Sequence, residues 1–447
     1  MKIATIYFKE IEDRFLVPFY LELKRIKSIK GEVLGKFVDL FTGKRVPQFS
    51  FVNQNYHNAI KYFNVQDIKT PFLNNIGISW INPKVVKITP LKTGDLIVSR
   101  VGTAGKVSIV TPLENNGAFT DNAIIIRIKD NSVINPFLCV LFLNSRLGYR
   151  QIRSRKKGTL QEVINYNAIK NVRIPEIGEG KKDHLNKMVK LAIDYHIRAI
   201  NNITRAKQIF EEEININYKN IKEEKTYLVN SKDLSDILLP KFYYPKYLTT
   251  LKLLKKKFKT VKIGDIADIK RGDEVGSENY KKYIEKSDSD VPFIRTSDLV
   301  NYEVDNYPDY YIDEDIYKEL NQDLKEGDIL YTKDGKIGLT AMVTQEDKYI
   351  LASGIARIRI KKDLDPYYVF LVLSTEIGLY QALQRVVTAA TIPHLQSERL
   401  AELEIPLINP QKQKEISNLI KEAFELKSKK KKLIKEAINQ VENLLKI

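Results

Sequence analysis

One Gly-rich ribbon occurs twice in this chain, and this repeat constrains the possible fold more than any other feature. "LKTGDLIVSRVGTAGKVSIV" runs from Leu91 to Val110, and "LKEGDILYTKDGKIGLTAMV" runs from Leu324 to Val343. Both ribbons contain a Gly-Asp pair, and both carry a basic residue at the centre, Arg100 in the first and Lys333 in the second. A long-period repeat of this kind predicts two copies of one structural unit.

Further matches between the copies follow in the same order along the chain. "LGKFVDLFTGK" (34–44) matches "IGDIADIKRGD" (263–273), and "NPFLCVLFLNSRLGYRQI" (135–152) matches "DPYYVFLVLSTEIGLYQAL" (365–383). The others are "DRFLVPFY" (13–20) with "PKFYYPKY" (240–247), "NAIIIRIKD" (122–130) with "GIARIRIKKD" (354–363), and "AIKNVRIP" (168–175) with "RLAELEIP" (399–406). Collinear matches about 230 residues apart predict an internal duplication, and the low identity indicates a shared framework with different surfaces.

The early part of each copy has the composition of β-strands, and a helix follows. "IVSR", "KVSIV" and "AIIIRI" in the first copy, and "ILYTK" and "IARIRI" in the second, are β-branched and bounded by Gly and Asp turns. Asn135 and Asp365 suit the N-cap of the following helix, and Pro136 and Pro366 suit its first position. The ribbon itself is expected to form a β-hairpin, because its glycines permit a tight reversal.

Each copy ends in a segment with the 3.5-residue period of a coiled coil. Each segment is roughly 35 residues, or about 50 Å of helix. Because neither seam has a partner within its own copy, we expect the two helices to pair antiparallel, with His196 as a packed seam residue and Lys430 as an interruption. The expected pairing residues are Val189, Ala192, Ala199, Ile203, Phe210, Leu419, Ala423, Leu426, Leu433 and Val441.

The predicted fold class is therefore α+β, with two similar mixed α/β domains joined by two long antiparallel coiled-coil helices in a pseudo-twofold arrangement. The expected divisions are a first domain at 1–180, a central helix at 181–223, a second domain at 224–408 and a C-terminal helix at 409–447.

Composition favours a polyanionic partner. The net charge is +17 with a pI near 9.4, which favours nucleic acid or an anionic membrane. No apolar run approaches the roughly 20 residues that span a bilayer, and the N-terminus has no apolar signal core. We therefore expect a cytoplasmic protein that binds nucleic acid and no membrane. The single cysteine, Cys139, is expected to be buried, and four scattered histidines show no metal-ligand spacing.

Two motifs suggest catalysis and fail on inspection. "GTAGKVS" lacks the four-residue spacer of a phosphate-binding P-loop, and Val107 stands where the magnesium-binding hydroxyl is needed. "DPYY" at Asp365 lacks the second proline of the amino-methyltransferase signature, so a helix cap explains it better. We expect no catalytic site, no metal and no cofactor in this chain.

Two interpretations of the ribbon remain open: a purely structural hairpin, or a hairpin whose basic residues face DNA phosphates. "RQIRSRKKGT" (150–159) is a second basic stretch, whereas its match "QALQRVVTAAT" (381–391) is nearly neutral, and "KSKKKK" (427–432) is either a solvated helix face or a DNA contact. The candidate DNA-binding residues are Arg100, Thr103, Lys106, Arg153, Arg155, Lys156, Lys157, Arg271, Lys333, Lys336 and Arg385.

The order of these features resembles the specificity (S) subunit of Type I restriction–modification systems, the HsdS family. The two "LKxGD" ribbons, "FYYPKY" at Phe242 and "IPLINPQKQKEISNLI" from Ile405 carry the resemblance, while "RIPEIGEGKKDHL" after the first copy departs from the family's Pro-rich turn. The resemblance implies two target-recognition domains on a split double-stranded DNA site, spaced by the helices. It also implies two docked methyltransferase (M) subunits, with a restriction (R) subunit able to join. S-adenosylmethionine and ATP would then be bound by the partner subunits.

A second class of function stays open at this stage. The same duplicated plan would suit a non-catalytic scaffold or adaptor whose paired domains bind protein or RNA, with the positive charge incidental. A steep loss of DNA affinity with salt, and sequence-specific binding in the presence of competitor DNA, would distinguish the two classes.

Overall fold

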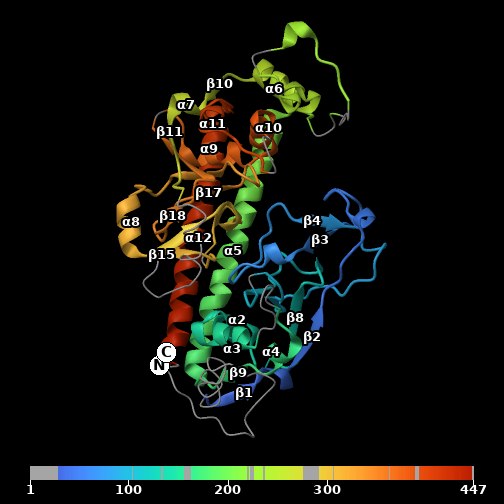
Figure 1. The fold of residues 1–447 in the computed structure, drawn as a ribbon, viewed down its shortest axis with the longest axis vertical. Coiled ribbons are helices and arrows are strands. Elements are labelled where there is room, and N and C mark those ends of the chain that lie inside the picture. Colours follow the sequence, from blue (N-terminus) through green and yellow to red (C-terminus); the bar gives the residue numbers. More distant parts are fainter. Residues whose placement is uncertain are drawn as a thin grey trace. The chain divides into compact units, whose positions relative to one another are not determined.

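The computed structural model describes residues 29–444 apart from 103, 132–133, 156–162, 219–220, 222–225, 235–236, 275–290, 306, 362 and 388–391. The chain divides into two compact units (Figure 1). The first unit comprises Met1–Ile197 and Lys430–Ile447, and the second comprises Arg198–Lys429. Each unit thus takes one part of each long helix, so the expected division into two domains and two whole spacer helices stays a prediction.

Each unit contains a four-stranded antiparallel sheet of the same topology. The strand order is β2-β8-β5-β6 in the first unit and β11-β19-β16-β17 in the second. The strands are β2 (Val38–Thr42), β8 (Ala123–Ile128), β5 (Leu96–Ser99), β6 (Val107–Ile109), β11 (Ala267–Arg271), β19 (Ile355–Ile360), β16 (Ile329–Thr332) and β17 (Thr340–Met342). The predicted ribbon hairpins are confirmed as β5–β6 and β16–β17.

The smaller sheets repeat as well. A three-stranded sheet in each unit has a central strand with an antiparallel neighbour on one side and a parallel neighbour on the other. These strands are β4 (Ser79–Ile81), β3 (Ile60–Phe63) and β7 (Ala118–Phe119), then β15 (Tyr311–Ile312), β12 (Val291–Ile294) and β18 (Ile350–Leu351). Two antiparallel pairs also correspond, β1 (Gly31–Val33) with β9 (Arg173–Pro175), and β10 (Thr260–Lys262) with β20 (Glu404–Pro406).

Nine strands of the first unit therefore have a counterpart in the second, and each counterpart begins 229 to 233 residues later. This confirms the predicted duplication for the described part of both copies. The second unit also has a short hairpin, β13 (Leu299–Val300) with β14 (Glu303–Val304). The match of 13–20 with 240–247 lies partly outside the described residues.

A helical group follows the strands in each unit and begins as predicted. The Asn135 side chain accepts a hydrogen bond from the Phe137 amide at 2.8 Å, and Asp365 accepts one from the Tyr367 amide at 2.8 Å. The helices are α2 (Pro136–Asn144), α3 (Arg146–Ser154) and α4 (Tyr166–Lys170), then α9 (Pro366–Leu373), α10 (Glu376–Arg385) and α11 (Ser397–Ala401). The second unit further has α6 (Pro245–Lys257), α7 (Ile263–Ile266) and α8 (Glu314–Leu320). Short 3₁₀ turns occupy Leu34–Lys36, Gln48–Ser50, Val65–Asp67, Ser231–Asp233, Pro240–Tyr243 and Thr296–Asp298.

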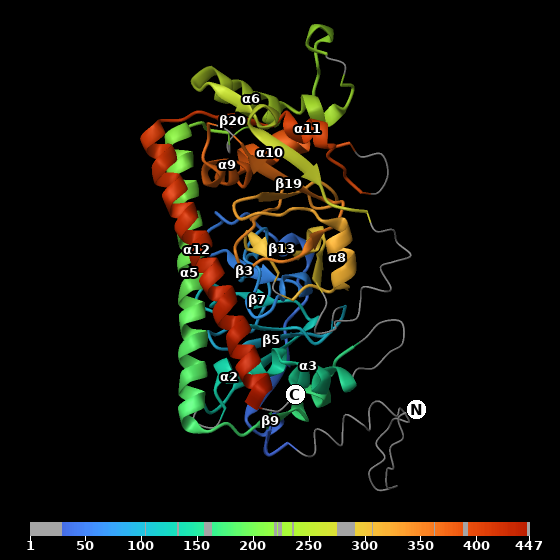
Figure 2. The same cartoon turned by 90° about the vertical axis from the view of Figure 1, so that its left-hand side faces the viewer.

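The two coiled-coil segments are single long helices (Figure 2). α5 (Glu179–Ile214) has 36 residues and α12 (Pro410–Leu444) has 35. Met188 contacts Gln440 in the first unit, and Arg198 pairs with Glu422 in the second at 3.2 Å, so the helices run antiparallel. Most of the expected pairing residues are buried, while Leu419 and Leu433 are only half-buried.

The lysine run of α12 differs from the expectation of a solvated or DNA-facing surface. Lys427, Lys430 and Lys431 are all less than 10% exposed. In the second unit, Lys427 donates a hydrogen bond to the Asn301 carbonyl at 2.6 Å and lies 3.6 Å from Glu303. The expectation is wrong for these three residues, because they lie on the face of α12 that packs against the domains. The remaining residues of the run are half-buried or exposed to solvent.

An aromatic ring in each unit packs against a lysine on the long helix of the other copy. In the first unit, Phe72 stacks on His196 of α5 with ring centroids 4.7 Å apart, and Lys430 of α12 lies 5.6 Å from the Phe72 ring. In the second, Lys207 of α5 lies 4.8 Å from the Tyr302 ring. His196 is therefore a packed residue, as predicted, and each ring is held by a cation from the helix of the opposite copy.

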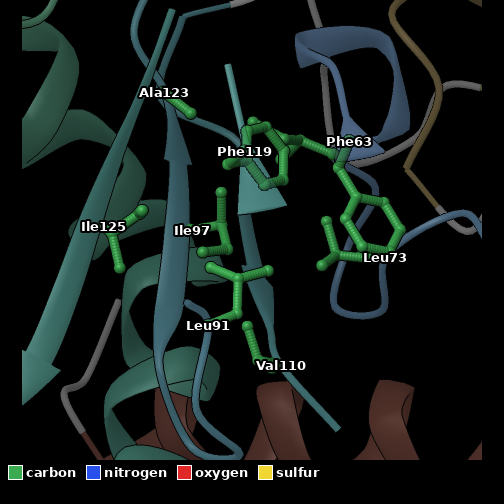
Figure 3. Packing of buried hydrophobic residues seen from close by; sticks show 9 residues of the cluster. Phe63, Leu73, Leu91, Ile97, Val110, Phe119, Ala123 and Ile125 are labelled. Atoms are coloured by element: carbon green, nitrogen blue, oxygen red, sulfur yellow. The ribbon is translucent and has the colours of Figure 1, made fainter. Parts of the chain in front are cut away.

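The core of the first unit lies between its two main sheets (Figure 3). Phe63 of β3 and Phe119 of β7 stack with centroids 5.9 Å apart. Ile97 of β5 and Ile125 of β8 pack in the same cluster and are fully buried. The sheets are therefore fixed against each other directly beneath the loop that follows β7, where the candidate site lies.

Candidate nucleic-acid interface

The Gly-Asp pair of the ribbon serves a structural purpose. Asp95 is buried and accepts a hydrogen bond from the Lys92 amide at 2.8 Å. Arg127 of β8 donates to both oxygens of Asp95, from Nε at 2.8 Å and from Nη2 at 2.6 Å. This hydrogen bonding to Asp95 raises the pKa of Arg127, which keeps the guanidinium charged. The pair fastens the start of the hairpin to the neighbouring strand.

The second unit repeats the arrangement. Asp328 accepts from the Lys325 amide at 2.8 Å, and Arg359 of β19 donates to it from Nε and Nη2, both at 2.7 Å. The Asp328 carboxylate likewise raises the pKa of Arg359. The hairpin tips also agree, because Gly105 and Gly338 have φ of 101° and 89°, a region that favours glycine. Both units thus use the same ribbon structure to hold the side chains at its tip.

The basic residue at the centre of the ribbon differs in exposure between the copies. Arg100 is half-buried, and its amide donates to the Asn122 carbonyl at 3.1 Å. Lys333 has the equivalent backbone bond, to Gly354 at 2.9 Å, but its side chain is buried with Nζ 3.6 Å from Asp334. The expectation that Lys333 faces phosphates is therefore wrong. Lys106 is half-buried and Lys336 is exposed near the tips.

The other basic candidates are dispersed. Arg153 is half-buried and donates to the Tyr149 hydroxyl at 2.6 Å, Arg155 is half-buried, and Arg271 is exposed at the end of β11. Arg385 is half-buried and donates to Glu402 at 3.2 Å and to two acceptors of its own helix, and its contact with DNA stays a prediction. Thr103, Lys156 and Lys157 lie outside the described residues.

The structure adds a hollow that the sequence did not reveal. It lies in the first unit beside the end of β5, has a volume of about 820 Å³, and its lining is divided evenly between polar and apolar surface. The side chains that matter for recognition are Arg45, Gln48, Phe51, Asn64, Asp121 and Asn122. Since the Arg100 amide bonds Asn122, the hollow and the centre of the ribbon adjoin. One sequence signal was available: 48–58 is rich in Asn and Gln between aromatic residues.

The walls of the hollow are held by backbone hydrogen bonds. The Lys44 amide donates to the Phe119 carbonyl at 2.8 Å, and the Val52 amide to the Trp80 carbonyl at 2.9 Å. Gly43 approaches the Phe119 carbonyl so closely that a Cβ there would lie 2.0 Å from its oxygen. Phe51 packs edge-on against Tyr62 of β3 with centroids 5.7 Å apart. The polar side chains are thus carried on a fixed platform, which recognition requires.

The same end of the second unit carries different side chains. Gly354 occupies the position of Asn122, as the shared backbone bond shows. Arg295 stands at the position of Asn64, where it stacks on Tyr310 at 3.8 Å and pairs with Asp309 at 3.1 Å. Asp334 contacts His394 at the ribbon tip. The two units therefore combine one backbone framework with two sets of exposed chemistry.

Two further observations concern the described part of the chain. No group of three or more His, Cys, Asp or Glu that could hold a metal ion occurs among these residues. None of the helices described is both long and apolar enough to cross a membrane.

The mixed sheet framework occurs twice, the ribbon tips differ, and each unit contains part of both long helices. These features define the protein as an internally duplicated α+β protein whose two copies carry different surface side chains. The profile of the family described as "Type I restriction modification DNA specificity domain" matches residues 255–441. Residues 255–441 are therefore similar to a specificity domain of Type I restriction–modification systems, which bears out the predicted resemblance to that family. DNA-sequence recognition is the function of this domain class.

Solved structures give weaker likenesses. The Type I restriction–modification S subunit from M. genitalium shares 14% identity, with 94% of this chain and 95% of that chain covered and a TM-score of 0.35. The HsdS subunit from Thermoanaerobacter tengcongensis shares 14% identity over 93% and 95%, with a TM-score of 0.29. At these scores the assignment depends on the family profile. No curated protein sequence matches the chain significantly.

Proposed function

We propose that this chain recognises a split site on double-stranded DNA, one half with each unit, and leaves catalysis to docked methyltransferase subunits. One observation carries the proposal: equivalent backbone positions at the two ribbon ends hold Asn122 in one unit and Gly354 in the other. Shared frameworks with different recognition side chains are what two unlike half-sites require, because base edges are distinguished by side-chain donors and acceptors.

The helices are proposed to be the spacer between the half-sites. α5 and α12 have 36 and 35 residues, or about 54 and 52 Å of helix at 1.5 Å per residue. Half-sites one turn of DNA apart are about 34 Å between centres. Helices of this length are sufficient for such a separation.

Electrostatics support DNA as the partner. A net charge of +17 favours polyanions through counterion release. The described basic candidates that remain after the buried Lys333 is excluded are Arg100, Lys106, Lys336, Arg153, Arg155, Arg271 and Arg385. Their role would be to position the protein on phosphates, with base identity supplied by the hollow and by its counterpart in the second unit.

The proposal is tested by binding the purified full-length chain to a library of random DNA duplexes in the presence of competitor DNA. The expected result is enrichment of a split motif with a fixed gap, and an affinity that falls steeply between about 50 and 200 mM salt. Enrichment of no motif, together with an affinity that is insensitive to salt, would favour a scaffold that binds protein.

Docking of methyltransferase subunits needs a separate measurement. Co-expression of the chain with a Type I methyltransferase subunit encoded in the same genome, followed by mapping of methylated adenines, should show methylation only within the selected motif. Methylation that is unchanged when this chain is omitted would contradict the assignment of specificity to it.

A further inference from the structure

We propose that the hollow of the first unit recognises an adenine in duplex DNA through the side-chain amides of Gln48 and Asn122. This inference depends on the proposed function and makes it more specific, because it names the base and the residues that contact it. No sequence motif suggested these two residues as contacts. They are identified by the geometry of the hollow.

The two amides are available to a ligand. Gln48 and Asn122 are exposed and line the same hollow. Within the part of the chain that the structure describes, neither side-chain amide makes a hydrogen bond to another residue, although the Asn122 backbone is fixed by Arg100. A primary amide offers an acceptor and two donors. Adenine presents the complementary pair in the major groove, its N7 acceptor and its N6 amino donor.

Asp121 adds a negative charge to the hollow, and this charge disfavours binding of a phosphate or of a guanine edge. Its carboxylate lines the hollow and accepts a hydrogen bond from the Thr120 hydroxyl at 3.0 Å. A carboxylate repels phosphate, so the part of the hollow beside Asp121 is unsuited to the DNA backbone. It also disfavours the guanine edge, which presents two acceptors, and favours a base with an exocyclic amino group. Arg45 remains at the same hollow as a contact for a flanking phosphate.

Exposed aromatic residues near the hollow are suited to contact the thymine that pairs with the adenine. Phe51 lines it and is 42% exposed, and Phe49, two residues earlier, is 76% exposed. These exposed rings offer an apolar surface to a bound base. The thymine paired with adenine presents its C5-methyl group in the same groove, where apolar side chains contact it. An A·T pair thus satisfies the amides and the rings together.

The second unit has no such pair of amides at the equivalent described positions. Gly354 replaces Asn122, and Arg295 replaces Asn64 with its guanidinium already bound to Asp309 and stacked on Tyr310. Substitutions at Gln48 and Asn122 should therefore alter one half-site only. The other half-site serves as an internal control for folding and for binding.

The experiment compares the full-length chain with Gln48→Ala, Asn122→Ala and a matched control, Gln54→Ala. Gln54 is exposed on the same segment and does not line the hollow. Each variant is used to select duplexes from a random library, and its thermal midpoint is measured to confirm folding. Each hollow variant should lose roughly ten- to hundredfold of its preference for adenine at one position of one half-site. Gln54→Ala should select the wild-type motif.

The outcomes are distinguishable. If the wild-type chain selects a split motif and both hollow variants select the same motif unchanged, the hollow is not a base-recognition site, although the proposed function survives. If the variants lose preference at a guanine or cytosine, the assignment to adenine is wrong. If both half-sites weaken uniformly, the residues contact phosphate. If the wild-type chain selects no motif, the proposed function fails and this inference fails with it.

Discussion

Arg127 donates two parallel hydrogen bonds to the Asp95 carboxylate, and Arg359 donates the same two to Asp328 in the second copy. Each Asp begins a ribbon hairpin, and each Arg lies on the strand beside it. The repeated pair explains why the Gly-Asp signature occurs twice. It fixes the hairpin so that the residues at its tip can differ.

Removing the Asp95 charge should destabilise the first unit. Asp95 is buried and the Arg127 side chain is about one quarter exposed, so Asp95→Asn leaves a partly desolvated guanidinium with a poorer partner. We expect a loss of about 2–4 kcal/mol, somewhat below the loss for a fully buried pair. Asp328→Asn should have a similar effect on the second unit. Chemical denaturation measures both.

The matched control for this prediction is Asp39→Asn, which breaks the exposed Asp39–Lys129 pair of the same sheet. An exposed pair contributes about 0–1 kcal/mol, so the control should unfold nearly as the wild type does. Equal effects of Asp95→Asn and Asp39→Asn would show that the ribbon does not depend on this pair.

The framework was predictable from sequence because it depends on repeated local signals. The strand runs, the helix caps at Asn135 and Asp365, and the 3.5-residue seams each specify a local structure, and each occurs twice. The hollow was not predictable, because Gln48, Asn64 and Asn122 come together only when separate strands pair. The burial of Lys333 and Lys430 was missed for a similar reason: a charge is buried only where tertiary contacts supply its partner.

Phe72 should be a major anchor of the first unit on the long helices. It is 4% exposed and packs between His196 and Lys430. Phe72→Ala should therefore cost about 3–5 kcal/mol of unfolding free energy through lost burial and a residual cavity. Phe49→Ala is the control of equal chemistry, since Phe49 is 76% exposed and its removal should leave stability nearly unchanged. If the Phe72 variant were as stable as the Phe49 variant, Phe72 would not be an anchor of the first unit on the long helices.

The chain's single thiol offers a probe of the first unit. Cys139 lies on α2 with no exposed surface, and burial raises the pKa of its thiol to about 12. Because the thiolate is the reactive form, iodoacetamide at pH 8 should leave the native thiol unmodified, and labelling should follow unfolding. Phe72→Ala should accelerate the labelling. Complete modification of the native wild type within the mixing time would contradict the buried placement.

Glu114 should give the first unit a characteristic pH dependence. Burial raises the pKa of this carboxyl despite hydrogen bonds from Asn75 and Thr111. The folded state therefore binds the proton more tightly than the unfolded chain does. This contribution to stability is present below the ordinary carboxyl pKa of about 4.3 and is lost as pH rises through the raised value.

Glu114→Gln removes this ionisation while an amide oxygen can still accept from Thr111. The unfolding free energy of the variant should fall less than that of the wild type as the pH rises from about 4 towards neutrality. Denaturant titrations at several pH values make the comparison. Parallel pH profiles for the two proteins would show that Glu114 does not titrate differently on folding.

The most direct test of the central claim, two recognition units spaced by paired helices, changes the length of that spacer. Seven residues inserted into α5 before Arg198 and into α12 before Lys430, where the two units divide, lengthen both helices by one heptad and preserve their paired faces. The addition is about 10.5 Å, or roughly three base pairs. Duplexes selected by this variant should contain the wild-type half-sites with a gap longer by about three base pairs. An unchanged gap, or half-sites that change while the gap stays fixed, would contradict the account.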